Sequence, residues 1–293
     1  MVVKHLYVLL TMLLAGCSCQ EQKAVSLFRF QPEPGKKYEF AVEKISSSGA
    51  AGGISGDSLI FQFSLLSKHA DSNGTGLRML IDMFRFVKPR FISHDTGSKH
   101  LKKSNQFAGM MVTYLAEELQ IMEAFAGDSL TLFVNEYGHL IMEDGLDDFI
   151  QHVSQKTGLD EGRVKLTVRE FLSPSTIKDL FTEIFFYLPV KQVNEKESWV
   201  TNTMLSARAP VKYSNMIMLD TVFNNEATLK IKSRISAGGE GNTYMQGNRI
   251  GNVTVDLSSG IPSLSSFIDE TITHTTGGDI KTKRTFQLTS KLR

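Results

Sequence analysis

The sequence predicts an α+β protein built mainly from antiparallel β-strands. Apolar and polar residues alternate over long stretches, as at Tyr38, Phe40 and Val42, which is the period of a half-buried strand. Clusters of Gly, Asn, Asp and Ser separate these stretches, and turns favour those residues. A strongly helical stretch lies near the middle of the chain. We therefore expect two β-rich halves, which as curved sheets would form half-barrels, joined by a helical segment.

The N-terminus has the order of a secretory signal peptide. Lys4 begins a short basic start, an apolar run from Leu6 to Leu14 follows, and Leu14-Ala15-Gly16-Cys17 ends it. A cysteine directly after small residues resembles the lipobox of bacterial lipoproteins. The resemblance implies that residues 1–16 are removed as a signal peptide and that Cys17 is acylated. Residues 17–30 would then be a lipidated tether.

A transmembrane anchor is the alternative for this apolar run. A membrane-spanning helix needs about 20 apolar residues, and Leu6 to Gly16 is too short. Several acyl chains on one cysteine hold a protein firmly to a membrane, whereas a single chain does not. We therefore expect a lipid-anchored protein of the bacterial cell envelope, at the outer membrane. The sequence leaves open whether it faces the periplasm or the cell surface.

Composition narrows the class of protein. The formal net charge of the 293 residues is +1, which argues against a nucleic-acid partner because such proteins have a strongly basic face. The only two cysteines are Cys17 and Cys19, so acylation of Cys17 leaves no pair for an intrachain disulfide. No His or further Cys lies near them, and we expect neither a metal site nor a cofactor.

The N-terminal β-rich half is expected to span residues 31–145. Strands are predicted at Ser58 to Leu66 and Leu77 to Val87, while the glycine-rich stretch from Ser46 to Gly56 is predicted to be a long hairpin loop. A clear hairpin follows, in which the turn Asn135-Glu136-Tyr137-Gly138 joins two short strands.

The helical segment is expected at residues 146–189. One helix begins near Leu146, with Asp147 and Asp148 in its first turn, where acidic residues complement the helix dipole. Another begins at Ser173-Pro174, an N-cap followed by proline at the first helical position. The aromatic residues of this region either line an apolar ligand pocket or belong to an ordinary core. They are Phe181, Phe185, Phe186 and, just beyond the segment, Trp199.

The C-terminal half, residues 190–293, is expected to be an antiparallel sheet. Leu229, Ile231 and Ile235 alternate with Lys230, Lys232 and Arg234, which predicts one face buried and one face in water.

Several motifs together resemble an uncharacterised family of Bacteroidota lipoproteins, a domain of unknown function. They are the lipobox, Pro34-Gly35-Lys36-Lys37-Tyr38, the hairpin from Val134 to Leu140, and Tyr187-Leu188-Pro189-Val190 leading to Ser198-Trp199. The resemblance covers nearly the whole mature chain. It implies an envelope location and supplies no catalytic residues.

Three functions remain open from the sequence. The first is a non-enzymatic lipoprotein that binds an apolar ligand or an envelope protein, with a fold resembling the half-barrels that carry lipids or lipoproteins. The second is a hydrolase of envelope polymers that uses paired carboxylates, chosen from Glu143, Asp144, Asp147 and Asp148. The third is a structural component of a surface assembly. No nucleophile or metal motif of a known enzyme class occurs in a suitable context.

Overall fold

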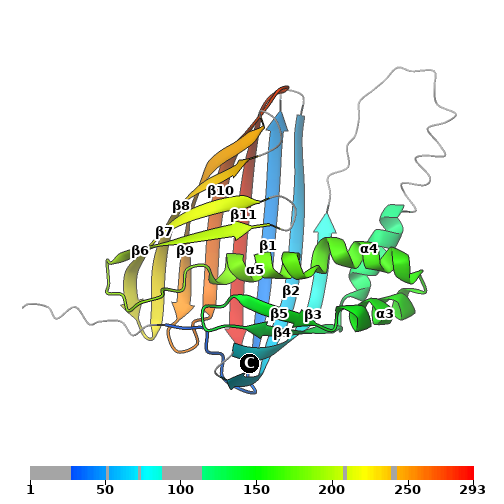
Figure 1. The fold of residues 1–293 in the computed structure, drawn as a ribbon, viewed down its shortest axis with the longest axis horizontal. Coiled ribbons are helices and arrows are strands. Elements are labelled where there is room, and N and C mark those ends of the chain that lie inside the picture. The colour runs from blue at the N-terminus through cyan, green and yellow to red at the C-terminus, as the bar shows by residue number, and fades with distance from the viewer. Residues whose placement is uncertain (1–27, 51–52, 72–73, 88–113, 207–209, 239–242) are drawn as a thin grey trace, which may run out of the picture.

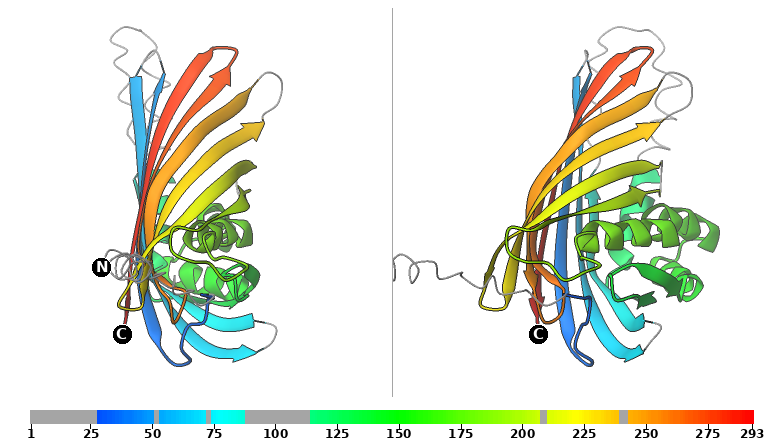
Figure 2. Two further views of the ribbon diagram at one scale, coloured as in Figure 1. Left: turned by 90° about the vertical axis from the view of Figure 1, so that its left-hand side faces the viewer. Right: turned by 60° about the vertical axis from the view of Figure 1, so that its left-hand side comes forward.

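The computed structural model describes residues 28–50, 53–71, 74–87, 114–206, 210–238 and 243–293. In these residues the chain forms one large, curved antiparallel sheet with helices on its concave side (Figure 1, Figure 2). The strands of the N-terminal half are β1 (Lys37–Ala50), β2 (Gly53–Asp71), β3 (Gly74–Val87), β4 (Ser129–Val134) and β5 (Leu140–Asp144). The helices are α3 (Leu146–Thr157), α4 (Glu161–Leu172) and α5 (Pro174–Phe185). The strands of the C-terminal half are β6 (Ser198–Leu205), β7 (Val211–Phe223), β8 (Glu226–Gly238), β9 (Tyr244–Asp256), β10 (Pro262–Thr275) and β11 (Gly278–Leu292). Residues 114–124 are also helical.

The two β-rich halves form one continuous sheet. Its strand order is β5-β4-β3-β2-β1-β11-β10-β9-β8-β7-β6, and every neighbouring pair is antiparallel. The first strand, β1, pairs with the last, β11, from Tyr38 opposite Leu292 to Gly49 opposite Lys281. This central pair joins the halves, and the predicted α+β, mainly antiparallel class is confirmed.

The glycine-rich stretch from Ser46 to Gly56 is not the long loop that the sequence predicts. Strand β1 continues to Ala50 and β2 begins at Gly53, with Ser46 opposite Asp57. Because β1 is also paired with β11, its backbone groups find partners on both sides over this length. This long ladder outweighs the weak strand preference of Gly and Ser, which depends strongly on context.

Helix α5 begins where the sequence predicts it to begin. The Ser173 Oγ accepts a hydrogen bond from the Thr176 N–H at 3.2 Å, and Pro174 occupies the first turn. Helix α3 also begins as predicted, with Asp147 and Asp148 in its first turn. Helix α4, whose N-cap is Asp160, lies within the predicted helical segment but was not predicted as a separate helix.

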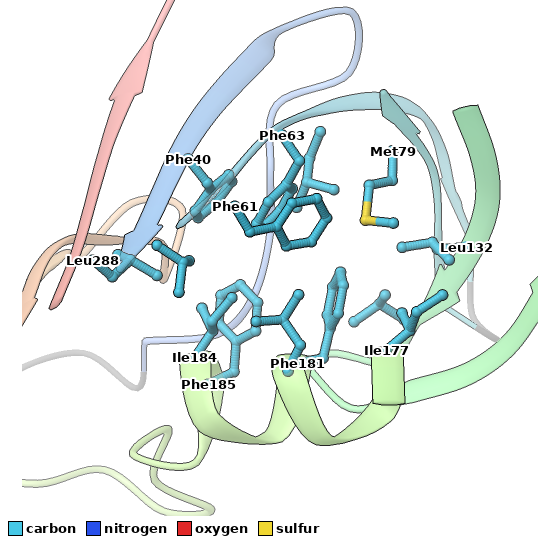
Figure 3. Close-up of a cluster of buried hydrophobic side chains, with 14 of the residues drawn as sticks. Phe40, Phe61, Phe63, Met79, Leu132, Ile177, Phe181, Ile184, Phe185 and Leu288 are labelled. Atoms are coloured by element: carbon cyan, nitrogen blue, oxygen red, sulfur yellow. The ribbon is translucent and has the colours of Figure 1, made fainter. Parts of the chain in front are cut away.

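The core lies between the concave face of the sheet and helix α5 (Figure 3). Phe40 and Phe63 stack from neighbouring strands, with ring centroids 5.0 Å apart. Phe181 and Phe185 approach them from α5, and both are at most 1% exposed. Each fully buried side chain of this kind contributes about 1.5–3 kcal/mol, so the apolar stripe of α5 is a principal attachment of the helix to the sheet.

The turn between β4 and β5 packs closely against helix α5. The Asn135 Oδ1 accepts hydrogen bonds from the backbone N–H groups of Tyr137 and His139, at 3.0 and 2.9 Å. Gly138 has a φ of +75°, and a Cβ atom there would lie 2.4 Å from the Cβ of Phe185. Glycine is therefore required both by the backbone conformation and by the closeness of α5.

We predict that Gly138→Ala destabilises the protein by more than backbone strain alone. Gly35 is the matched control, because its φ is +77° and nothing lies within 4 Å of the position that a Cβ atom would occupy there. Gly35→Ala should cost about 1–2 kcal/mol of unfolding free energy, the cost of a left-handed non-glycine residue. Gly138→Ala should cost about 1–3 kcal/mol more, because Phe185 must move. Urea denaturation checks this, and equal losses in the two variants would show that the contact with Phe185 is unimportant.

Candidate functional site

A row of polar side chains crosses the concave face of the sheet. Strand pairing places Thr201, Asn215, Ser233, Arg249, Asp269, Arg284, Ser46 and Asp57 side by side, one from each of eight neighbouring strands from β6 to β2. The row begins with hydrogen bonds from the Asn215 Nδ2 to the Thr201 Oγ1 and from the Ser233 Oγ to the Asn215 Oδ1. The adjacent row contains Trp199, Ile217, Ile231 and Phe267 and is largely apolar. The polar row therefore marks one boundary of the apolar core.

Glu183 joins helix α5 to this row. Its side chain is 3% exposed and accepts hydrogen bonds from the Lys44 ammonium, from Arg284 Nη2 at 2.8 Å and from Arg249 Nη2 at 3.4 Å. These three cations come from β1, β11 and β9, so one carboxylate ties the helix to three strands.

Asp269 completes the charged cluster on the sheet. It accepts hydrogen bonds from Arg249 Nε at 2.6 Å and from Arg284 Nη2 at 2.7 Å. The guanidinium of Arg249 also lies over the ring of Tyr213, 4.5 Å from its centroid. The Tyr213 hydroxyl accepts a hydrogen bond from Arg284 at 3.0 Å. Every charge in the cluster is thus paired, as burial of charges requires.

Burial and neighbouring charges shift the pKa values of the groups in this cluster. Burial alone would raise the pKa of Glu183, but the positive charges of Arg284, Lys44 and Arg249 outweigh it and hold that pKa well below its usual value. Burial would also raise the pKa of Asp269, but Arg249 and Arg284 outweigh burial and lower it. Burial raises the pKa of the Tyr213 hydroxyl to about 12. Both carboxylates are therefore ionised and the tyrosine is neutral at neutral pH.

A pocket lies between helices α4 and α5 and the sheet, directly beside the charged cluster. Its volume is about 370 Å³. The greater part of its wall is apolar and comes from β2, β3, α4, α5 and the β6–β7 edge: Leu59, Phe61, Phe84, Phe86, Phe171, Leu172, Ile177, Leu180, Leu205 and Val211. Its polar wall contains Lys44, Ser46, Asp57, Glu170, Thr176, Asp179, Glu183, Tyr213 and Arg284. An apolar pocket with a few converging polar groups is typical of small-ligand sites.

The apolar wall of the pocket is built from interlocking aromatic rings. Phe171 of α4 packs against both Phe84 and Phe86 of β3, each with ring centroids 5.3 Å apart. Phe61 of β2 packs against Phe84 at the same separation. These contacts fix the width of the pocket, because rotating one ring would displace its neighbours.

A larger hollow, of about 1450 Å³, lies along the next residues of β6–β11 and β1. Its lining includes five charged residues, Lys212, Arg234, Glu270, Lys281 and Lys283. Most of these side chains are exposed. The smaller pocket is the better candidate site, because it combines an apolar wall with buried charged groups.

The four aromatic residues singled out from the sequence lie in the closed core. Phe181, Phe185 and Phe186 are at most 4% exposed and Trp199 is 8% exposed. None of the four is among the residues that line the pocket beside α4 and α5. Phe181 contacts Phe185, whereas Phe186 and Trp199 contact other core rings, those of Phe267 and Phe28.

The candidate hydrolase carboxylates lie outside this pocket, Glu143 and Asp144 at the end of β5 and Asp147 and Asp148 at the start of helix α3. Asp144 accepts the backbone N–H of Gly145 at 2.8 Å, while Asp147 and Asp148 lie in the first turn. Burial, with the nearby charges of Asp144 and Asp147, raises the pKa of Glu143. None of these four residues lines the pocket.

The signal residues Leu14, Ala15 and Gly16 and the lipidation site Cys17 lie outside the described residues. Among the residues that the structure describes, no helix has the length and apolarity needed to cross a membrane. No group of three or more His, Cys, Asp or Glu side chains within those ranges is arranged to hold a metal ion.

The residues that form the charged cluster were not predicted from the sequence. Lys44, Arg249, Asp269 and Arg284 each occupy a core-facing position of an alternating strand, and Glu183 occupies the buried stripe of α5. A charged residue at an inward-facing position of a strand or helix could have indicated the cluster, since charged residues are rarely buried unless they are paired.

Comparisons with known proteins identify a family and a distant structural likeness. A family model described as "Family of unknown function (DUF6263)" matches residues 101–262. A search of curated proteins gives no match. Among solved structures, the chain is similar to one titled "Lipid-protein interactions in lipovitellin", with 10% sequence identity and a TM-score of 0.50. The likeness covers 89% of this chain but only 26% of that one, so it concerns about a quarter of the lipovitellin chain and the fold alone.

We predict that Glu183→Gln costs about 3–5 kcal/mol of unfolding free energy, because it removes one partner from a buried charged cluster. The variant should also be less sensitive to acid. The folded-state pKa of Glu183 lies below its unfolded value, so its stabilisation is present above the unfolded pKa of about 4.3 and is lost as the pH falls below it.

Urea denaturation between pH 7 and pH 3 measures both effects. Glu270→Gln is the control, because Glu270 follows Asp269 in β10 but has a 72% exposed side chain. An unchanged acid dependence in Glu183→Gln would contradict the central role of Glu183.

Proposed function

The chain belongs to a family of unknown function, so we propose its role from the geometry of the pocket: it binds the apolar part of a small amphiphile. The observation that supports this proposal is the pocket of about 370 Å³ between helices α4 and α5 and the sheet. Its aromatic wall offers apolar surface that a ligand chain would remove from water, at about 25 cal/mol per Å².

The pocket size favours one acyl chain over two. Pockets for small ligands span about 300–1,000 Å³, and this one lies near the lower limit. The lipovitellin structure, whose title concerns lipid–protein interactions, shares the fold and agrees with this proposal without identifying a ligand.

The proposed role is binding rather than catalysis. Hydrolysis by paired carboxylates needs one acid that holds its proton near neutral pH. Among the carboxylates of the pocket wall, Glu183 is kept ionised by Lys44, Arg284 and Arg249. Asp179 accepts hydrogen bonds from the backbone N–H of Ser206, at 2.8 and 3.1 Å. These two groups are therefore suited to holding the structure together.

The proposed location is the bacterial cell envelope, with the chain anchored through an acylated Cys17. The order of Lys4, the apolar run and the lipobox supports this location. A lipid-anchored binding protein would hold its ligand close to a membrane, from which an amphiphile could be taken or to which it could be delivered.

We predict that protein purified from its own envelope carries a small amphiphile. Native mass spectrometry should show the bound mass, and Val211→Trp should reduce its occupancy severalfold because the larger ring fills the pocket at β7. Val200→Trp is the control, since Val200 lies on the neighbouring strand β6 and is 64% exposed. Wild-type protein without a bound amphiphile would contradict the proposal. A co-purifying protein in place of a lipid would favour a role in binding an envelope protein.

We also predict that Cys17→Ser moves the protein from the membrane fraction to the soluble fraction. Removing the thiol removes the site of acylation, and no second acylated cysteine is expected. Fractionation, with labelling by an alkyne analogue of palmitate, provides the measurement. Cys19→Ser is the control and should stay membrane-bound and labelled; equal behaviour of the two variants would contradict lipidation at Cys17.

A further inference from the structure

Two cations of the charged cluster present unused hydrogen-bond donors to the pocket. Lys44 and Arg284 line it, and their side chains are 21% and 26% exposed. Among the described residues, the Lys44 ammonium has one acceptor, Glu183, for its three N–H groups. All hydrogen bonds of Arg284 come from Nε and Nη2, so within the same described residues Nη1 donates to none. Two residues of the pocket wall therefore carry donors that an acceptor group of a ligand can use.

The charges of the cluster also favour an acceptor with negative charge. Lys44, Arg249 and Arg284 carry three positive charges, whereas Glu183 and Asp269 carry two negative ones. The cluster thus keeps one net positive charge. Charge-assisted hydrogen bonds to an oxyanion are about twice as strong as neutral ones.

Asp57 places an opposite charge at the other side of the same polar end. It lies in the polar row beyond Ser46, which separates it from Arg284, and it is a diagonal neighbour of Lys44 across the β1–β2 pair. With strands about 4.8 Å apart, the backbones of Asp57 and Arg284 are about 10 Å apart. Within the described part of the chain, no hydrogen bond or ion pair to Asp57 is present, unlike the neighbouring wall residues Glu170 and Asp179.

We propose that the pocket selects a single-chain zwitterionic amphiphile whose head group carries an oxyanion beside an ammonium group. Lys44 and Arg284 bind the oxyanion, Asp57 binds the ammonium group, and the chain lies between Phe61, Phe84 and Phe171. This inference rests on the proposed function and adds the chemical class of the ligand. It explains why free donors and a free carboxylate meet at one end of an apolar pocket.

The test compares head groups on the same chain. The full-length protein with Cys17→Ser is titrated by calorimetry, below micelle formation, with lysophosphatidylethanolamine and with lysophosphatidylglycerol of equal chain length. We expect about tenfold tighter binding of the ethanolamine lipid, equivalent to about 1.4 kcal/mol. Glycerophosphoethanolamine, which has the head group without the chain, should bind far more weakly; binding as tight as that of the lipid would point to a free phosphoester as ligand and overturn the proposal.

Variants assign the selectivity to its residues. Asp57→Asn should abolish the preference for the ethanolamine lipid and leave the affinity for the glycerol lipid equal or higher. Lys44→Met should weaken both lipids about tenfold, while Glu183 keeps Arg284 and Arg249 as partners. Glu43→Gln is the control, since Glu43 precedes Lys44 in β1 and points to the opposite face of the sheet. Thermal melting checks that each variant is folded.

Equal affinity for the two lipids in the wild-type protein would overturn this inference but leave the binding of an apolar chain intact. Unchanged selectivity in Asp57→Asn would also overturn it. Failure to bind any single-chain amphiphile would overturn the proposed function as well, so the two failures are distinguishable.

Discussion

The ion cluster around Glu183 connects helix α5, which covers the pocket, to the sheet that forms its floor. One carboxylate of α5 contacts cations from β1, β9 and β11. The apolar stripe of the helix supplies most of the attachment energy, but apolar contacts are not directional. The charged contacts place the helix at one position along the strands, because a displaced Glu183 would leave buried cations without a partner. That position also places Ile177 and Leu180 of α5 in the pocket wall.

The polar row extends this constraint across the sheet. Eight neighbouring strands each contribute one residue, and Arg249, Asp269, Ser233 and Asn215 are at most 4% exposed. Such a row fixes strand register, because a shift by one residue would turn every member to the outer face. Ser46 of β1 and Arg284 of β11 are neighbours in this row. The row therefore crosses the strand pair that joins the N-terminal and C-terminal halves. An open sheet of this size therefore has a polar seam where its apolar core ends.

Much of the fold could be predicted from local signals. Alternation at Leu229 and Ile231 identified a half-buried strand, and Ser173-Pro174 identified the start of α5, because these features depend on residues close in sequence. The family of unknown function was also anticipated and is confirmed. The glycine-rich stretch from Ser46 to Gly56 was wrongly predicted as a loop, since its strand structure depends on β11, more than 200 residues away. The length of a strand that is paired on both sides cannot be read from composition.

The candidate site was harder to predict for the same reason. Glu183 and Lys44 are 139 residues apart, and Arg284 and Glu183 are 101 apart, so no local pattern links them. The sequence directed attention to Phe181, Phe185, Phe186 and Trp199, which fill the core, whereas the pocket is lined by aromatic residues of β2, β3 and α4. Which buried aromatic residues border a pocket depends on how far α4 and α5 lie from the sheet.

Photo-crosslinking of a bound chain tests the account most directly. A lysophospholipid with a diazirine near the end of its acyl chain should label peptides containing Phe61, Phe84 or Phe171, and excess unlabelled lipid should suppress the labelling. Labelling confined to exposed outer-face residues such as Ile250 or Ile268, or labelling that excess lipid does not suppress, would contradict a ligand site beneath helix α5.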